Sequence, residues 1–247
     1  MSDHVPVENL DAAIEGYKSR GYRLDMIFPA DDPREARMSH ASESITLSQK
    51  DHPVGETPPP LLRKVGSPEW IRGRAGMEYR DLTPDRLGGK VVASHIRLLA
   101  GGPVPEYVHY HKIDFQVIYC KKGRIKVGYE DQGEPFWLET GDLVLQPPEI
   151  RHRVLECSAG AEVIEITSPA EHETWVDHEI RLPTGRVDPL RKFGGQRFFR
   201  YEAASPKSPD RPAEKQLIDL AASLKNACSD DEINKIVLTF SQSLCQT

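Results

Sequence analysis

The chain has 247 residues, 38% of them hydrophobic and 28% charged, which is the composition of an ordinary globular protein. Its formal net charge is -6 and it contains no long block of like charge, whereas a nucleic-acid surface needs clustered Lys and Arg. No apolar stretch approaches the roughly 20 residues that span a bilayer. We therefore expect no nucleic-acid partner and no membrane association.

The N-terminal sequence MSDHVPVENLDAAIEG has no basic start followed by an apolar run, so no secretory signal is predicted. The four cysteines are far apart and form no CxxC pair, so they are interpreted as free thiols in a reducing compartment. Together these features predict a cytoplasmic location.

Residues 1–50 predict a small N-terminal α+β appendage. Apolar side chains recur at helical spacing over residues 7–20, with Gly21 placed as a C-terminal stop. Alternating patterns over residues 22–28 and 43–47 predict strands, and about two or three strands are expected in this part of the chain. Residues 51–70 are rich in proline, which blocks helices and strand ladders, so a linker is expected there.

Residues 71–204 show a succession of short strand patterns separated by turn signals, which predicts an all-β barrel or sandwich. The expected strands cover residues 91–99, 115–120, 124–129, 136–138, 142–145, 153–156 and 163–167. Residues 205–247 begin with a second proline-rich linker and continue with two amphipathic helix patterns. These helices could pack on the barrel or dock on a partner.

The stretch that carries chemistry lies between residues 102 and 156. His109 and His111 are separated by one residue in a β-favouring run, so both imidazoles project from the same face of a strand. Gln116 begins the next strand pattern, and the bend Gln146–Arg151 delivers His152. A closed barrel can bring these side chains together. Three imidazoles and one amide oxygen would leave coordination positions open, as a catalytic metal requires.

The same stretch resembles the two sequence motifs of the cupin family. The first motif is matched by Gly102, His109, His111, Gln116 and Gly123, and the second by Gly141, Pro147, Glu149, His152 and Glu156. The chain is similar to long single-domain bacterial cupins through the phrases DFQ, GDLVLQPPEIRH and FGGQRF. The resemblance implies a double-stranded β-helix (jelly-roll) barrel, one divalent transition metal held by His109, His111, Gln116 and His152, and a homodimer.

Three positions depart from the cupin motifs. Gln116 stands where the family usually has a glutamate ligand, Glu149 replaces a glycine, and Glu156 replaces an asparagine. A neutral glutamine leaves the ion its full charge, which is expected to favour anionic or enolate-like substrates. Glutamine at this position is similar to cupins that linearise unsaturated uronic sugars, whereas glutamate is typical of flavonol-type dioxygenases.

Side chains that flank the ligands are candidates for acid, base or substrate contact, and Tyr107 and Glu149 are the two that we select as catalytic. His172 and His178 are six residues apart, a spacing that suits neither a strand face nor a helix turn. We therefore interpret them as surface or hydrogen-bonded histidines and predict no second metal site.

These features predict a metal-dependent enzyme that acts on a small oxygenated substrate, an enol, carbonyl or phenol, as a dioxygenase. The ion could be Fe, Mn, Ni, Zn or Cu, because three histidines and one glutamine suit several first-row metals. One alternative is an isomerase or lyase that acts on a sugar acid without dioxygen. Another is a non-catalytic cupin that binds a small molecule.

Overall fold

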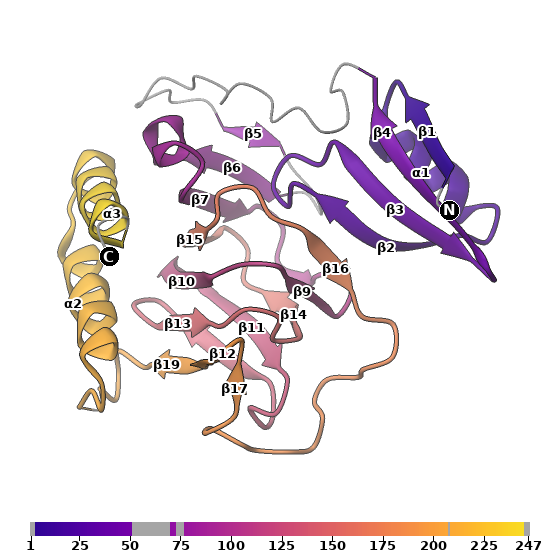
Figure 1. The fold of residues 1–247 in the computed structure, drawn as a ribbon. Helices are drawn as coiled ribbons and strands as arrows, with labels where there is room; N and C mark the ends of the chain where they lie inside the picture. The colour runs from indigo at the N-terminus through magenta and orange to yellow at the C-terminus, as the bar shows by residue number, and fades with distance from the viewer. Residues whose placement is uncertain (1–2, 51–69, 73–76, 207, 245–247) are drawn as a thin grey trace.

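The computed structural model describes residues 3–50, 70–72, 77–206 and 208–244. Within these ranges the chain forms two large β-sheets with a helical layer on one side and a smaller α+β unit on the other (Figure 1). The linker predicted over residues 51–70 lies outside the described residues, apart from Trp70.

One sheet has seven strands in the order β19-β13-β10-β15-β7-β6-β5. Its central strands pair antiparallel in long registers, such as Gln116↔Thr167 between β10 and β15. The strands are β5 (Ile71–Arg72), β6 (Met77–Asp81), β7 (Val92–Leu98), β10 (Phe115–Lys122), β13 (Leu143–Gln146), β15 (Ala161–Ser168) and β19 (Phe199–Tyr201).

The second sheet has ten strands in the order β1-β4-β3-β2-β16-β9-β14-β11-β12, with β8 paired to β14. Its strands are β1 (Asp3–Val7), β2 (Arg23–Phe28), β3 (Glu35–His40), β4 (Glu43–Gln49), β8 (Gly102–Pro103), β9 (His109–His111), β11 (Arg124–Tyr129), β12 (Phe136–Glu139), β14 (His152–Cys157) and β16 (Thr174–Val176). A separate hairpin joins β17 (Lys192–Phe193) to β18 (Gln196–Arg197), and a 3-10 turn covers Pro84–Leu87.

The seven strands predicted between residues 91 and 167 are all present, with ends shifted by at most two residues. Alternate side chains of each strand point between the sheets and form a buried core that includes Ile96, Ile125 and Val163. Consecutive strands cross between the two sheets, so the sheets close as a jelly-roll barrel. The predicted fold class is confirmed.

The N-terminal unit contains a helix and four strands. Helix α1 (Leu10–Lys18) begins at Asn9, whose side chain accepts a hydrogen bond from the Ala12 backbone. The helix predicted over residues 7–20 is therefore shorter than expected, because Val7 ends strand β1, and strands β1 and β3 were not predicted. The sheet of this unit is continuous with the barrel, since β2 pairs with β16 at Thr174↔Ile27.

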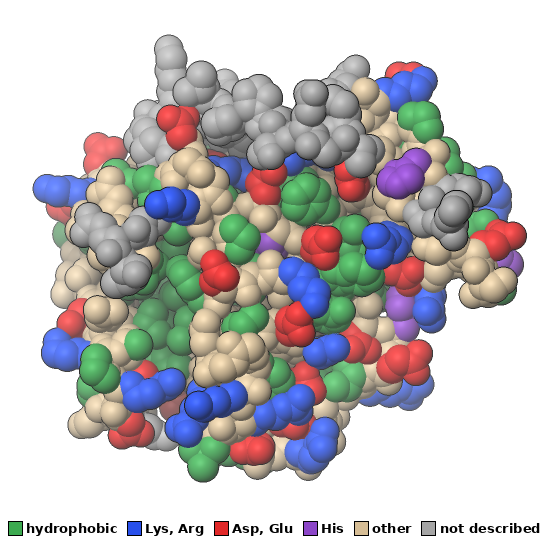
Figure 2. All heavy atoms as spheres, in the orientation of Figure 1, with side chains coloured by type: hydrophobic (Ala, Val, Ile, Leu, Met, Phe, Trp, Pro, Cys, Tyr) green, Lys and Arg blue, Asp and Glu red, His purple; other side chains and the backbone are tan. Residues whose placement is uncertain are grey.

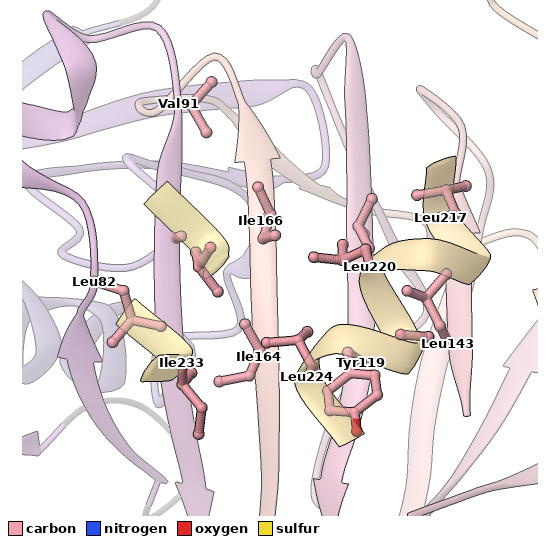
Figure 3. Close-up of a cluster of buried hydrophobic side chains, with 14 residues drawn as sticks. Leu82, Val91, Tyr119, Leu143, Ile164, Ile166, Leu217, Leu220, Leu224 and Ile233 are labelled. Atoms are coloured by element: carbon pink, nitrogen blue, oxygen red, sulfur yellow. The ribbon is translucent and has the colours of Figure 1, made fainter. Parts of the chain in front are cut away.

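The two predicted C-terminal helices pack on the outer face of the seven-stranded sheet. They are α2 (Pro212–Asn226) and α3 (Asp230–Leu244), and their apolar stripes meet the outward side chains of β10, β13 and β15 (Figure 3). Leu220 and Leu224 of α2 share this buried cluster with Tyr119 and Ile164. Of the two roles left open for these helices, packing on the barrel is the one observed.

The three cysteines within the described ranges, Cys120, Cys157 and Cys228, are free thiols, as expected. None of the described helices combines the length and apolar character required to cross a bilayer. On the face shown in Figure 2, Lys and Arg side chains are interspersed with Asp and Glu.

Candidate metal centre

Three buried histidines meet between the two sheets. Strand β9 supplies His109 and His111, whose rings lie on the same face because they are two residues apart. Strand β14 pairs antiparallel with β9 at His152↔His109, which brings the third ring to the same place. One ligand atom from each residue lies within 4.8 Å of the other two, so the group could hold a metal ion.

Hydrogen bonds fix the orientation of each imidazole. His109 donates from Nδ1 to the Tyr107 carbonyl at 2.9 Å, and His152 donates from Nδ1 to the Ile150 carbonyl at 3.0 Å. Nδ1 of His111 lies 2.8 Å from the Thr174 hydroxyl, which can accept its hydrogen. With Nδ1 protonated, the lone pair of each ring is on Nε2, the arrangement that metal-binding histidines usually have.

Burial also keeps His152 in the form that binds a metal. Removal from water, together with the neighbouring His109, lowers the pKa of His152 from its usual 6.5 to about 3. His152 is therefore neutral over the ordinary pH range, and a metal ion would not have to displace a proton from it. The donor set fits a divalent transition ion.

Gln116 lies beside the histidines on strand β10, where the sequence predicted it. Its side chain is buried, and its Nε2 donates to the Thr167 hydroxyl at 3.1 Å. Its Oε1 accepts from Gln146 Nε2 at 2.7 Å, and the same Gln146 nitrogen lies 3.2 Å from His152 Nε2. The Gln116 oxygen and the His152 nitrogen therefore both face the amide nitrogen of Gln146.

Gln146 is a site residue that the sequence did not single out. It was assigned to the bend before His152, but it lies directly across the strand pair from Gln116. Its Oε1 is buried and has no hydrogen-bond partner among the described residues. No local pattern could have identified it, because its contact with Gln116 depends on the register between β10 and β13.

The two predicted catalytic side chains lie away from the histidines. Tyr107 precedes strand β9 and is 54% exposed, although its carbonyl orients His109. Glu149 occupies a turn with a positive φ of 59° and pairs with Lys112 near the surface. Neither side chain lines the cavity around the histidines, so the structure gives no support to a catalytic role for them.

His172 is closer to the centre than the sequence indicated. It was interpreted as a surface or hydrogen-bonded residue, and the hydrogen-bonded alternative is the correct one, since Nδ1 contacts the Pro169 carbonyl at 3.2 Å. The side chain is buried, and its ring centroid lies 5.2 Å from that of His111. It precedes strand β16, whose pairing with β9 carries it to the site.

The histidines open into a cavity of about 110 Å³ between the sheets. Its walls are largely apolar and include Ile96, Ile118 and Val127, and Tyr129 lies near His152 with ring centroids 5.7 Å apart. The turn after β2 adds Ala30 and Asp31, so the N-terminal unit contributes part of the wall. An ion held by the three histidines would keep coordination positions open toward this mainly apolar cavity, where a small molecule could bind them.

Comparison with known proteins gave partial structural similarities. No protein-family model matches the chain, and neither does any curated protein. A variant of oxalate decarboxylase from Bacillus subtilis has 22% identity and a TM-score of 0.31, covering 38% of this chain and 25% of that one. KdgF from a Halomonas species has 20% identity and a TM-score of 0.33, covering 41% of this chain and 86% of that one. The chain thus spans about a quarter of the oxalate decarboxylase that it matches.

The structure of the chain itself decides the fold. Two antiparallel sheets close into a jelly-roll barrel, and the histidines of the two sequence motifs meet inside it. Both features were implied by the cupin resemblance of the sequence. The chain has a cupin fold with a three-histidine centre that could hold a metal ion.

Proposed function

We propose that the protein is a metal-dependent enzyme that acts on a small enol, carbonyl or phenol as a dioxygenase. The observation that carries this proposal is the convergence of three buried imidazoles, each fixed through Nδ1, at the wall of a mainly apolar cavity. A divalent ion bound there would supply Lewis acidity and, for a redox-active metal, electron transfer to dioxygen.

Within this proposal, Gln116 is the fourth ligand. Gln146 Nε2 donates to Gln116 Oε1 at 2.7 Å and lies 3.2 Å from His152 Nε2, so an ion that binds the single Nε2 lone pair of His152 would replace the Gln146 contact there. Thr167 fixes the other end of the Gln116 amide. An amide oxygen and three imidazoles are neutral, so the ligands would not select strongly among Fe, Mn, Ni, Zn and Cu.

The surrounding chain would bind the substrate and exclude water. Aliphatic walls favour an apolar body, and the buried Tyr129 hydroxyl can donate a hydrogen bond, because burial raises its pKa above the usual value. These features suit an enol or phenol that places its oxygen beside the histidines.

A second candidate is an isomerase or lyase that acts on a sugar acid without dioxygen. The observation in its favour is Gln116 itself, because a glutamine leaves the ligand set without a carboxylate. Turnover under nitrogen would distinguish it from the dioxygenase. A third candidate, a non-catalytic binding protein, would show ligand-induced stabilisation with no product.

The first test is the metal content of purified wild type, His152→Ala and the control His40→Ala, in which an exposed histidine far along the chain is removed. We expect near-stoichiometric metal in wild type and the control, and loss from His152→Ala at unchanged circular dichroism. Dioxygen uptake with enols, flavonols and catechols then tests the reaction. Unchanged metal in His152→Ala, or absence of metal from reconstituted wild type, would contradict the proposed centre.

A further inference from the structure

Gln146 is a buried glutamine whose hydrogen bonds are incomplete. Its side chain is 1% exposed, less than any of the three histidines. The amide nitrogen has two hydrogens and two neighbouring acceptors, since Nε2 lies 2.7 Å from Gln116 Oε1 and 3.2 Å from His152 Nε2. The amide oxygen has no hydrogen-bond partner among the described residues. Buried polar atoms are nearly always partnered, so this oxygen needs an explanation.

The tautomer of His152 fixes which end of the Gln146 amide faces the histidines. The Ile150 carbonyl, 3.0 Å from His152 Nδ1, can only accept a hydrogen bond, so Nδ1 carries the hydrogen of the neutral ring. His152 Nε2 is then an acceptor, and the Gln146 atom that faces it must be a donor. The same nitrogen also contacts Gln116, whose facing atom must therefore be its oxygen. Gln146 thus presents its amide nitrogen to two of the candidate ligands.

A divalent ion ligated by His152 is incompatible with this orientation of Gln146. The Nε2 atom of a neutral imidazole has a single lone pair, which the ion would take from the amide. One amide hydrogen would lose its acceptor, and its partial positive charge would face the ion. The terminal torsion of a glutamine is broad and roughly two-fold, so the amide can exchange its nitrogen and its oxygen. The rotated amide presents Oε1 to the ion, and the oxygen without a partner gains a positive one.

Gln146 approaches the centre from behind the cavity wall. Gln116 and His152 line the cavity, whereas Gln146 contacts both of them and is not itself among the described residues of the lining. It belongs to β13 and lies directly opposite Gln116 of β10 in the register of the seven-stranded sheet. A ligand on this side leaves the cavity side of the ion open for a small molecule.

We propose that Gln146 is a metal ligand in addition to the three histidines and Gln116, and that its amide rotates to place Oε1 on the ion. The inference rests on the proposed function, because it concerns the ligands of the same centre. Three imidazoles and two amides are neutral and leave one position of an octahedral ion open. A substrate would then bind the ion through a single atom.

The test uses Co²⁺, whose visible absorption depends on the number and the geometry of its ligands. Dissociation constants are measured by competition with a chelator, and spectra are recorded on the loaded proteins. Gln146→Leu removes the oxygen, so it should change the spectrum and weaken Co²⁺ binding at least about tenfold, since even partners that only orient a ligand contribute that much. The control Gln216→Leu, at an exposed position of α2, should change neither quantity.

Gln146→Glu separates ligation from hydrogen bonding. Glutamate keeps an oxygen at the same distance along the side chain, but it has no amide hydrogens for Gln116 and His152. If Gln146 is a ligand, the carboxylate replaces the amide oxygen and adds a negative charge, so this variant should bind Co²⁺ at least as tightly as wild type. Where Gln146→Leu does not fold, as judged by circular dichroism, the affinity of Gln146→Glu decides the matter.

Each of three results would overturn the inference. Binding by Gln146→Leu as tight as that by wild type would show that the ion merely displaces the amide. Weaker binding with an unchanged spectrum would show that Gln146 only orients Gln116 and His152. Weaker binding by Gln146→Glu than by wild type would show that the amide hydrogens are what the centre needs. In all three cases the centre itself would stand, whereas wild type that binds no Co²⁺ would contradict both proposals.

Discussion

The buried His95 on the outer face of β7 gives a prediction about stability in acid. Its side chain has no exposed surface, and it accepts a hydrogen bond from Arg80 at Nδ1 and lies 2.8 Å from the Glu162 carboxylate at Nε2. Both contacts suit the neutral ring that carries its hydrogen on Nε2. Burial and the charge of Lys121, opposed by Glu162, together lower the pKa of His95 from its usual 6.5 to about 4.

The sign of the effect follows from the two pKa values. The unfolded chain takes up this proton near pH 6.5 and the folded chain only near pH 4, so acid favours the unfolded state between these values. The contribution of His95 to the free energy of unfolding is complete above pH 6.5 and is lost as the pH falls toward 4. Between pH 7.5 and pH 4.5 the loss amounts to about 2.5 kcal/mol.

The assay is urea unfolding of metal-free protein at several values between pH 4.5 and 7.5, followed by circular dichroism. His95→Gln removes the titrating group, so the difference in unfolding free energy between wild type and variant should change by about 2.5 kcal/mol across this range. His40→Gln, at an exposed position, should follow the wild-type curve. Parallel pH curves for wild type and His95→Gln would refute the argument, because they would show that His95 takes up its proton equally in both states.

Two further predictions concern the helical layer and the metal centre. Leu220→Ala removes a side chain that is 4% exposed in the cluster between α2 and the sheet, so it should lower the free energy of unfolding by about 2–5 kcal/mol. The control Leu190→Ala removes a side chain that is 65% exposed, and in the same urea titration it should change this free energy by less than about 0.5 kcal/mol. Equal effects would contradict the packing described here. Thr174→Val removes the hydroxyl that orients His111, so it should weaken metal binding about tenfold to a hundredfold in a competition titration with a chelator. The control Thr239→Val, on the exposed face of α3, should leave the metal affinity unchanged. Unchanged affinity in Thr174→Val would show that this hydrogen bond does not orient the ring.

The local pattern of the sequence was enough to predict the strands of the barrel and the pair on β9. Side chains alternate along a strand, so residues two apart, such as His109 and His111, share a face whatever the strand pairs with. The apolar stripes of α2 and α3 were visible for the same reason, because helical periodicity is a local property. The cupin motifs then supplied His152 and Gln116, whose meeting with the pair is observed.

The remaining features depend on pairing between distant segments. Gln146 reaches Gln116 only through the register of β10 with β13, and His172 reaches His111 only through the strand that follows it, β16. Glu106, in the segment before β9, and Glu165, on β15, line the same cavity, and nothing in their local sequence marks them. The N-terminal sheet joins the barrel through β2 and β16, which lie far apart in the chain.

The sequence by itself therefore determined the spacing of apolar side chains in each helix and strand, the strand face that His109 and His111 share, and the chemical types of the candidate ligands. The tertiary structure alone decided which other side chains surround those ligands and what charge they carry. The physical reason is that side-chain direction is set by the local backbone, whereas strand register between distant segments is set by the packing of the whole core.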